Sequence, residues 1–148
     1  MAETFVLSKI LNVRENEKKN AEREYHYSMK LFEEIAEQFY HLLRKKEDAE
    51  ASYENYVHTT TPIDIIREQI SYIETLNKRI LKLQSEVQEA RIKMESKQIK
   101  LTDAHVEVKK FENMIEGRNQ KKAEHLKKEE NALMDEVSIQ QYLLHKNG

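Results

Sequence analysis

Positions that are mostly apolar, and polar in places, recur at alternating intervals of three and four residues over two long stretches of the chain. In the first stretch these positions are Leu7, Leu11, Arg14, Lys18, Ala21, Tyr25, Ser28, Phe32, Ile35, Phe39, Leu42, Lys46, Ala49, Tyr53 and Tyr56. In the second they are Ile66, Gln69, Ile73, Leu76, Ile80, Leu83, Val87, Ala90, Met94, Lys97, Leu101, Ala104, Val108, Phe111 and Ile115. Each series is termed a seam below. A heptad pattern sustained over this length predicts two long helices packed as a left-handed coiled coil.

The break between the two predicted helices is the run Thr59-Thr60-Thr61-Pro62, which holds the only proline of the chain. Proline has no backbone N–H and clashes with the preceding helical turn, so it ends one helix and suits the start of the next. Thr61 and Asp64 resemble a capping pair for the second helix. We therefore predict an all-α fold, a long antiparallel two-helix coiled-coil hairpin with its turn near residues 58–62. The expected helices cover residues 5–57 and 62–144, joined by residues 58–61, in one coiled-coil rod over residues 1–148.

A parallel dimer of one continuous helix is the alternative arrangement. It would place Pro62 in a helix interior, at a cost of about 3 kcal/mol, and this cost favours the hairpin. Folding the chain at the threonines aligns the two seams in one register, in which Leu42 faces Leu76 and Ser28 faces Ala90. Large apolar layers lie near the turn, and small or polar layers lie further from it. We expect the half beside the turn to be the stiffer one, because a fully buried leucine contributes roughly 1.5–3 kcal/mol.

The C-terminal segment, residues 117–148, has no facing partner in this register. It begins at Gly117, and the seam positions that follow are polar until apolar residues return at Ala132 and beyond. One interpretation is a solvated tail. The other is a segment ordered by another protein through its apolar residues, which are Leu133, Met134, Val137, Ile139, Leu143 and Leu144.

Charge and composition narrow the functional classes. The formal net charge of -2 gives no reason to expect nucleic acid or an anionic membrane as a partner, and the absence of cysteine excludes disulfides and a thiol active site. The start Met1-Ala2-Glu3-Thr4 lacks the layout of a signal peptide. No apolar run approaches the roughly 18 residues of a membrane span, so we expect no direct membrane insertion and a cytosolic protein.

No motif in the sequence indicates catalysis. There is no glycine-rich phosphate loop and no nucleophile elbow, and the six histidines are scattered. We therefore expect no enzyme activity, no metal site and no cofactor.

Two surface features are candidates for binding a protein. A basic run at the start of the C-terminal segment is either a solvated face or a docking surface for an acidic protein; its members are Arg118, Lys121, Lys122, Lys127 and Lys128. Large side chains beside the seam near the turn, such as Tyr40, Leu43 and Tyr72, either cover the seam or contact another protein.

Four stretches of the chain resemble the FliJ family. Members of this family are small coiled-coil components of the flagellar type III export apparatus. The stretches are residues 5–15 (FVLSKILNVRE), 72–80 (YIETLNKRI), 106–112 (VEVKKFE) and the tail 127–143, which contains Met134-Asp135-Glu136. The resemblance implies a hairpin similar to the stalk of the rotary ATPase gamma subunit. It also implies a non-enzymatic role in which the protein binds the hexameric export ATPase, promotes assembly of its ring and contacts the cytoplasmic domain of the membrane export gate and the export chaperones.

The resemblance also implies two sets of partner-binding residues. The predicted gate surface comprises Gln38, Leu42, Lys45, Tyr72, Leu76 and Arg79. This chain departs from the family at Lys45 and Ala49, where aromatics are expected, and at Arg79, where a small residue is expected. By analogy with gamma, the end that bears both termini enters the ATPase ring, so the ATPase-binding candidates are Arg118, Lys121, Lys122, Leu133, Met134 and Ile139. The alternative function is a generic scaffold or tether that acts by self-association, whereas a lone hairpin is expected to be monomeric when free.

Overall fold

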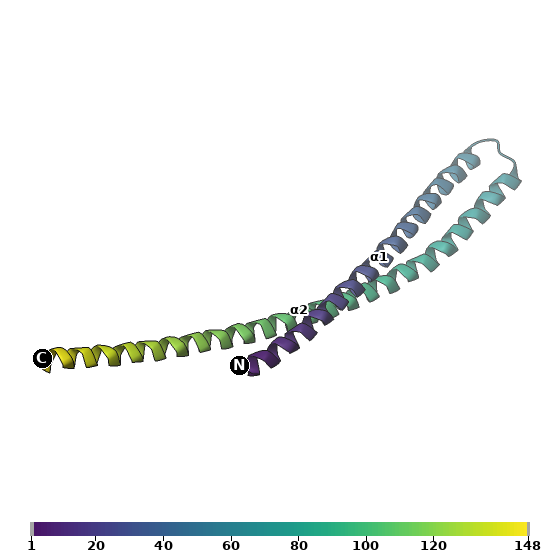
Figure 1. The fold of residues 1–148 in the computed structure, drawn as a ribbon. Helices are drawn as coiled ribbons and strands as arrows, with labels where there is room; N and C mark the ends of the chain where they lie inside the picture. The colour runs from purple at the N-terminus through teal and green to yellow at the C-terminus, as the bar shows by residue number, and fades with distance from the viewer. Residues whose placement is uncertain (1, 148) are drawn as a thin grey trace. The chain divides into compact units, whose positions relative to one another are not determined.

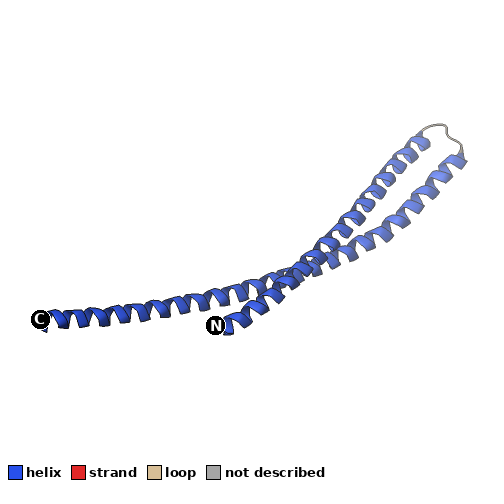
Figure 2. Ribbon diagram, in the orientation of Figure 1, coloured by secondary structure: helices blue, strands red, loops and turns tan. Residues whose placement is uncertain are grey.

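The computed structural model describes residues 2–147 and consists of two long helices joined by a short turn (Figures 1 and 2). Helix α1 covers Ala2–His58 and helix α2 covers Ile63–Asn147. The all-α helical hairpin predicted from the heptads is therefore confirmed. Helix α1 starts at Ala2 rather than residue 5, because alanine is the best helix former and Glu3 places a negative charge in the first helical turn.

The chain divides into two compact units, and each helix contributes to both. The terminal unit combines Met1–Lys18 with Ala104–Gly148, and the turn unit is Lys19–Asp103. Within the turn unit the two helical segments run antiparallel and lie side by side, because the short turn reverses the chain direction (Figure 1). Over residues 2–147 no helix is both long and apolar enough to cross a lipid bilayer.

The turn differs by one residue from the predicted one. The Pro62 carbonyl accepts the first hydrogen bonds of α2, from the N–H groups of Ile65 at 3.2 Å and Ile66 at 3.4 Å, so Pro62 rather than Thr61 occupies the N-cap position. The Thr59 hydroxyl donates to the Asn55 carbonyl at 2.9 Å and lies 3.0 Å from the Thr61 hydroxyl. Since Thr59 has already donated its only proton, Thr61 donates to Thr59. Thr59 therefore caps the end of α1, and the Thr61 hydroxyl bonds Thr59 rather than the start of α2.

The core of the turn unit follows the predicted seam. Every seam residue between 19 and 103 is buried or half-buried, and Leu76 is the most buried of them, with 2% of its surface exposed. The Gln69 side-chain amide donates to the Ala49 backbone carbonyl across the hairpin at 2.9 Å. This bond joins two residues that the predicted register places opposite each other, so it holds the helices in that register.

The terminal unit has a mixed seam. Leu7 and Val108 are buried, with 8% and 3% of their surfaces exposed. Arg14 also occupies a seam position; it pairs with Glu17 at 3.0 Å, lies 3.9 Å from Glu107 on α2 and stacks over the Phe111 ring. The arginine stem therefore covers apolar surface while its guanidinium reaches acids beside the seam.

Replacing Leu76 tests the seam directly. We expect Leu76→Ala to lower the free energy of unfolding by about 2–5 kcal/mol, because the substitution leaves a cavity in the best-packed layer. Chemical denaturation followed by circular dichroism measures the change.

The matched control is Leu81→Ala, on the same helix but at a position that is 67% exposed. Its expected effect is within about 0.5 kcal/mol. Equal losses from the two substitutions would contradict the seam described here.

Candidate functional site

The first candidate surface is a shallow groove of about 450 Å³ in the turn unit, termed the basic groove. Helix α1 supplies one wall and α2 the other; the lining residues are Gln38, His41, Leu42, Lys45, Arg79, Lys82, Leu83 and Glu86. Leu42 and Leu83 are half-buried seam residues, whereas the three cations are exposed. The groove therefore combines an apolar floor with a positively charged rim.

The structure brings together four of the six residues of the predicted gate surface. Gln38, Leu42, Lys45 and Arg79 all line the basic groove. The other two do not line it: Tyr72 is 46% exposed, and Leu76 is buried in the seam. Leu76 can support this surface only from beneath, because its side chain is covered by both helices.

Three further groove residues were not singled out from the sequence, whereas Leu83 belongs to the predicted seam. His41, Lys82 and Glu86 lie beside seam residues, and a search for the heptad positions that flank the seam would have found them. Gln38 and Lys45 are seven residues apart, as are Arg79 and Glu86, so each pair repeats on one side of its helix.

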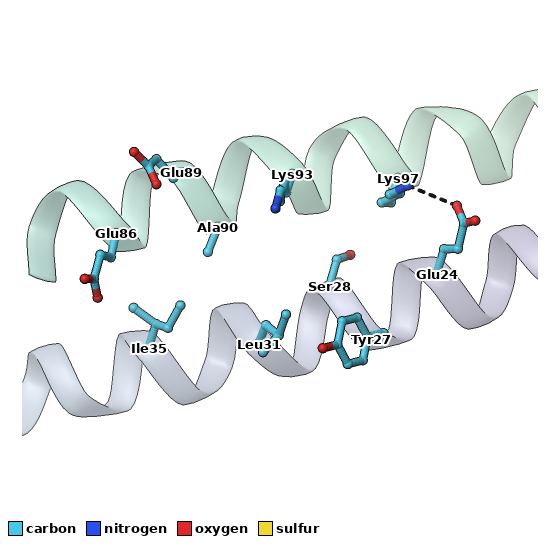
Figure 3. A pocket seen from close by; sticks show the side chains of 10 residues that line it. All are labelled: Glu24, Tyr27, Ser28, Leu31, Ile35, Glu86, Glu89, Ala90, Lys93 and Lys97. Atoms are coloured by element: carbon cyan, nitrogen blue, oxygen red, sulfur yellow. Dashed lines mark hydrogen bonds and ion pairs between the residues drawn. The ribbon is translucent and has the colours of Figure 1, made fainter.

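A second groove of about 530 Å³ lies in the same unit, where the sequence predicted a weak layer (Figure 3). Ser28 and Ala90 face the space between the helices there, and neither side chain is large enough to fill it. The buried Ser28 hydroxyl donates to the Tyr25 carbonyl at 2.8 Å, so its hydrogen-bonding capacity is used locally. Exposed Tyr27 and Leu31 border the space. The weak layer is thus a gap in side-chain packing, as its small residues predicted.

An ion pair bridges the helices at one end of this second groove. The Lys97 ammonium donates to the Glu24 carboxylate at 3.1 Å (Figure 3). The hydrogen bond from Lys97, together with the positive charge of that lysine, holds the pKa of Glu24 below its ordinary value. Lys97 is a seam residue, and it reaches an acid beside the opposite seam as Arg14 does.

The ATPase-binding candidates lie on the part of α2 that follows the seam. Every residue from 118 to 146 is exposed, and apolar Leu133, Met134 and Ile139 are 64%, 69% and 61% exposed. Arg118 is the one candidate with an ion pair to α1, through Glu3. Lys121 and Lys122 are exposed on the same helix.

The apolar candidates do not share one narrow face. Successive residues of an α-helix are separated by about 100°, so Leu133 and Met134 point in different directions. Leu126, Val137 and Leu144 align with Leu133 instead, because eighteen residues make about five turns. These four form an exposed apolar stripe. Leu126 lies one residue after His125, where the seam pattern continues, so the seam positions do not include it, although it lies seven residues before Leu133.

Gly117 marks the position where the C-terminal segment leaves the seam. It lies within α2, and a side chain at this position would meet no atom within 4 Å other than its chain neighbours and the adjacent helix backbone. Beside it, a third groove of about 460 Å³ is lined by Leu11 of α1 and by α2 residues Glu112, Ile115, Glu116, Asn119, Gln120 and Ala123. This groove, which combines apolar and polar side chains, is a second candidate surface of the terminal unit beside the exposed apolar stripe.

Among residues 2–147, no group of three or more histidine and acidic side chains is placed to hold a metal ion. The sites that the structure does offer are shallow grooves and an exposed helical face. Such surfaces are suited to contacts with another protein.

The Glu24–Lys97 pair makes the stability of the turn unit depend on pH. Because its pKa is lowered on folding, Glu24 contributes stability above its unfolded-state pKa, and this contribution is lost as the pH falls through the lowered folded-state pKa. We expect NMR titration of the Glu24 carboxyl to show a depressed midpoint, which Lys97→Met returns towards the ordinary glutamate value. An unchanged midpoint in the variant would exclude Lys97 as the cause.

Comparison with known proteins places this architecture in a family. The sequence matches the family described as "Flagellar FliJ protein" over residues 4–147. It is 34% identical over 144 residues to the Flagellar FliJ protein of Bacillus subtilis (strain 168), covering 97% of this chain and 98% of that relative. No solved structure matches the chain. The resemblance seen in the four sequence stretches is confirmed, and the chain belongs to the FliJ family of flagellar proteins.

Proposed function

We propose that this protein is a non-enzymatic coupling and assembly factor of flagellar type III protein export. It binds the hexameric export ATPase, promotes assembly of the ATPase ring and links it to the cytoplasmic domain of the membrane export gate. It also contacts export chaperones, and it acts without a cofactor. Membership of the FliJ family supports this role, together with exposed surfaces in both units of the chain.

The observation that carries the proposal is the exposed continuation of α2 beyond the seam. Residues 118–146 are helical and exposed throughout, although the stripe of Leu126, Leu133, Val137 and Leu144 is apolar. Burying one such side chain against a partner would contribute roughly 1.5–3 kcal/mol. A stripe that this chain does not cover is therefore suited to a protein partner, and we assign that partner as the export ATPase.

The basic run supports the same assignment. Lys121, Lys122, Lys127 and Lys128 are exposed next to the stripe, so an apolar contact and a charged contact can form on one helix. A charged rim around an apolar centre is the usual composition of a protein interface.

We assign the basic groove of the turn unit to the export gate.

We further propose that the protein acts in the cytoplasm, associates peripherally with the export apparatus at the membrane and binds no nucleic acid. Free in solution, it is a monomer, because each seam is covered by the other helix of the same chain. The net charge of -2 supports a protein partner over a polyanion.

Self-association is the competing function, and the exposed apolar stripe is the observation that favours it. A scaffold of this kind would form oligomers and leave ATPase turnover unchanged. Sedimentation distinguishes the two proposals, because a lone hairpin sediments as a monomer of 17.7 kDa.

A variant pair tests the ATPase contact. With purified export ATPase, we expect the wild-type protein to increase ring assembly and ATP turnover. Leu133→Ala combined with Val137→Ala should raise the half-maximal concentration for this stimulation by about tenfold or more, because two apolar side chains of the exposed stripe are removed.

The matched control is Ile99→Ala, which also removes an exposed apolar side chain from α2 (63% exposed) but lies in the turn unit. It should stimulate as the wild type does. An ATPase that responds to neither wild type nor variants would remove the ATPase role altogether.

A further inference from the structure

We propose that the basic groove binds carboxylate side chains of an acidic helical segment in its protein partner. This inference rests on the proposed function, in which the partner is the cytoplasmic domain of the export gate. It adds the chemistry of the contact: acidic side chains against Lys45, Arg79 and Lys82, and an apolar side chain against Leu42 and Leu83.

The first argument is the position of the charges in the heptads. Lys45 precedes the seam residue Lys46, and Arg79 precedes the seam residue Ile80. In an antiparallel pair, equivalent positions that flank the two seams face each other along one side. Lys45 and Arg79 hold this same flanking position, one on each helix, and both line the basic groove. Like charges that face each other oppose helix pairing.

The second argument is that these cations lack ion-pair partners. Among residues 2–147, no carboxylate lies within 4 Å of the charged groups of Lys45, Arg79 or Lys82, although other lysines and arginines of this chain do form such pairs. The one acid that lines the groove is Glu86, against three cations. The groove thus keeps a local positive charge in a chain whose net charge is negative.

The third argument is a contrast within the same chain. Glu17 and Glu107 occupy the equivalent flanking positions in the terminal unit, and they too are like charges. There, Arg14 of the seam pairs with Glu17 at 3.0 Å and lies 3.9 Å from Glu107, so the chain supplies its own counter-charge. In the basic groove the seam residues that line the floor are Leu42 and Leu83, which cannot neutralise a charge. The floor therefore supplies no counter-charge, and the single acid of the groove, Glu86, leaves an excess of positive charge for a partner's carboxylates.

The shape of the groove favours protein carboxylates over nucleic acid. A volume of about 450 Å³ holds a few side chains, and its leucine floor offers apolar contact that a phosphate backbone would not use. Binding a nucleic acid would also need more phosphate contacts than three cations provide. An amphipathic acidic helix matches both the floor and the rim.

Charge reversal tests the inference with the full-length protein and the purified gate domain. We expect Arg79→Glu to weaken binding by about tenfold or more. The affinity of this variant should also depend less on ionic strength than that of the wild type, because one attractive charge is lost. Lys45→Glu should weaken binding similarly while raising the melting temperature, because the new carboxylate lies in one groove with Arg79 and Lys82. A variant that gains stability and loses binding cannot be explained by misfolding. Lys30→Glu, which reverses an exposed lysine outside the grooves, is the matched control and should bind normally.

Two further probes separate this inference from the proposed function. Poly-L-glutamate should shift the NMR signals of residues around Lys45 and Arg79, and a single-stranded oligonucleotide should not. If poly-L-glutamate binds at the groove but the gate domain does not bind at all, the gate assignment fails and the carboxylate site stands. If the gate domain binds wild type and both reversed variants equally, the carboxylate site is wrong and the gate assignment stands. Binding of the oligonucleotide alone would also overturn the carboxylate site.

Discussion

Burial of one narrow apolar strip per helix is the interaction on which the whole structure depends. Residues 2–147 form no third layer, so the positions that flank each strip remain at the surface, and residues 118–146 of α2 are exposed throughout. The geometry that limits the core therefore leaves the positions beside both seams, and the exposed face of α2 over residues 118–146, accessible to a partner. A protein of this design has little interior in which to build a pocket, so its recognition residues must stand beside the seam.

Polar residues inside the seams limit how the two helices can pair. Gln69, Lys97 and Arg14 each hold a partner on the opposite helix, and each would lose that partner if one helix slid along the other. Apolar heptads alone tolerate such a shift, because one leucine layer resembles the next. The weaker, polar layers thus contribute specificity of alignment where they contribute little burial.

The seams were predictable residue by residue, because a seven-residue period determines which side of a helix is buried. The N-cap was missed by one residue, since hydrogen bonds around Thr59 and Pro62, rather than the pattern, decide where α2 begins. The grooves were not predictable from either helix alone, because each needs flanking residues from both. The ion pair between Lys97 and Glu24 was not predictable either, because it depends on side-chain conformations that the heptad pattern does not determine.

Gly117 and the exposed residues after it divide α2 into parts that can melt separately. Unfolding residues 118–146 would break helical hydrogen bonds but expose little additional apolar area, since those side chains are already in water. The dependence of stability on denaturant scales with the area newly exposed, so this part would add little to the denaturant slope. Amide hydrogen exchange would detect its opening, because each amide there is protected by its local helix alone. Order in this part of the helix is thus thermodynamically separate from the seam and can be gained on binding without altering the seam.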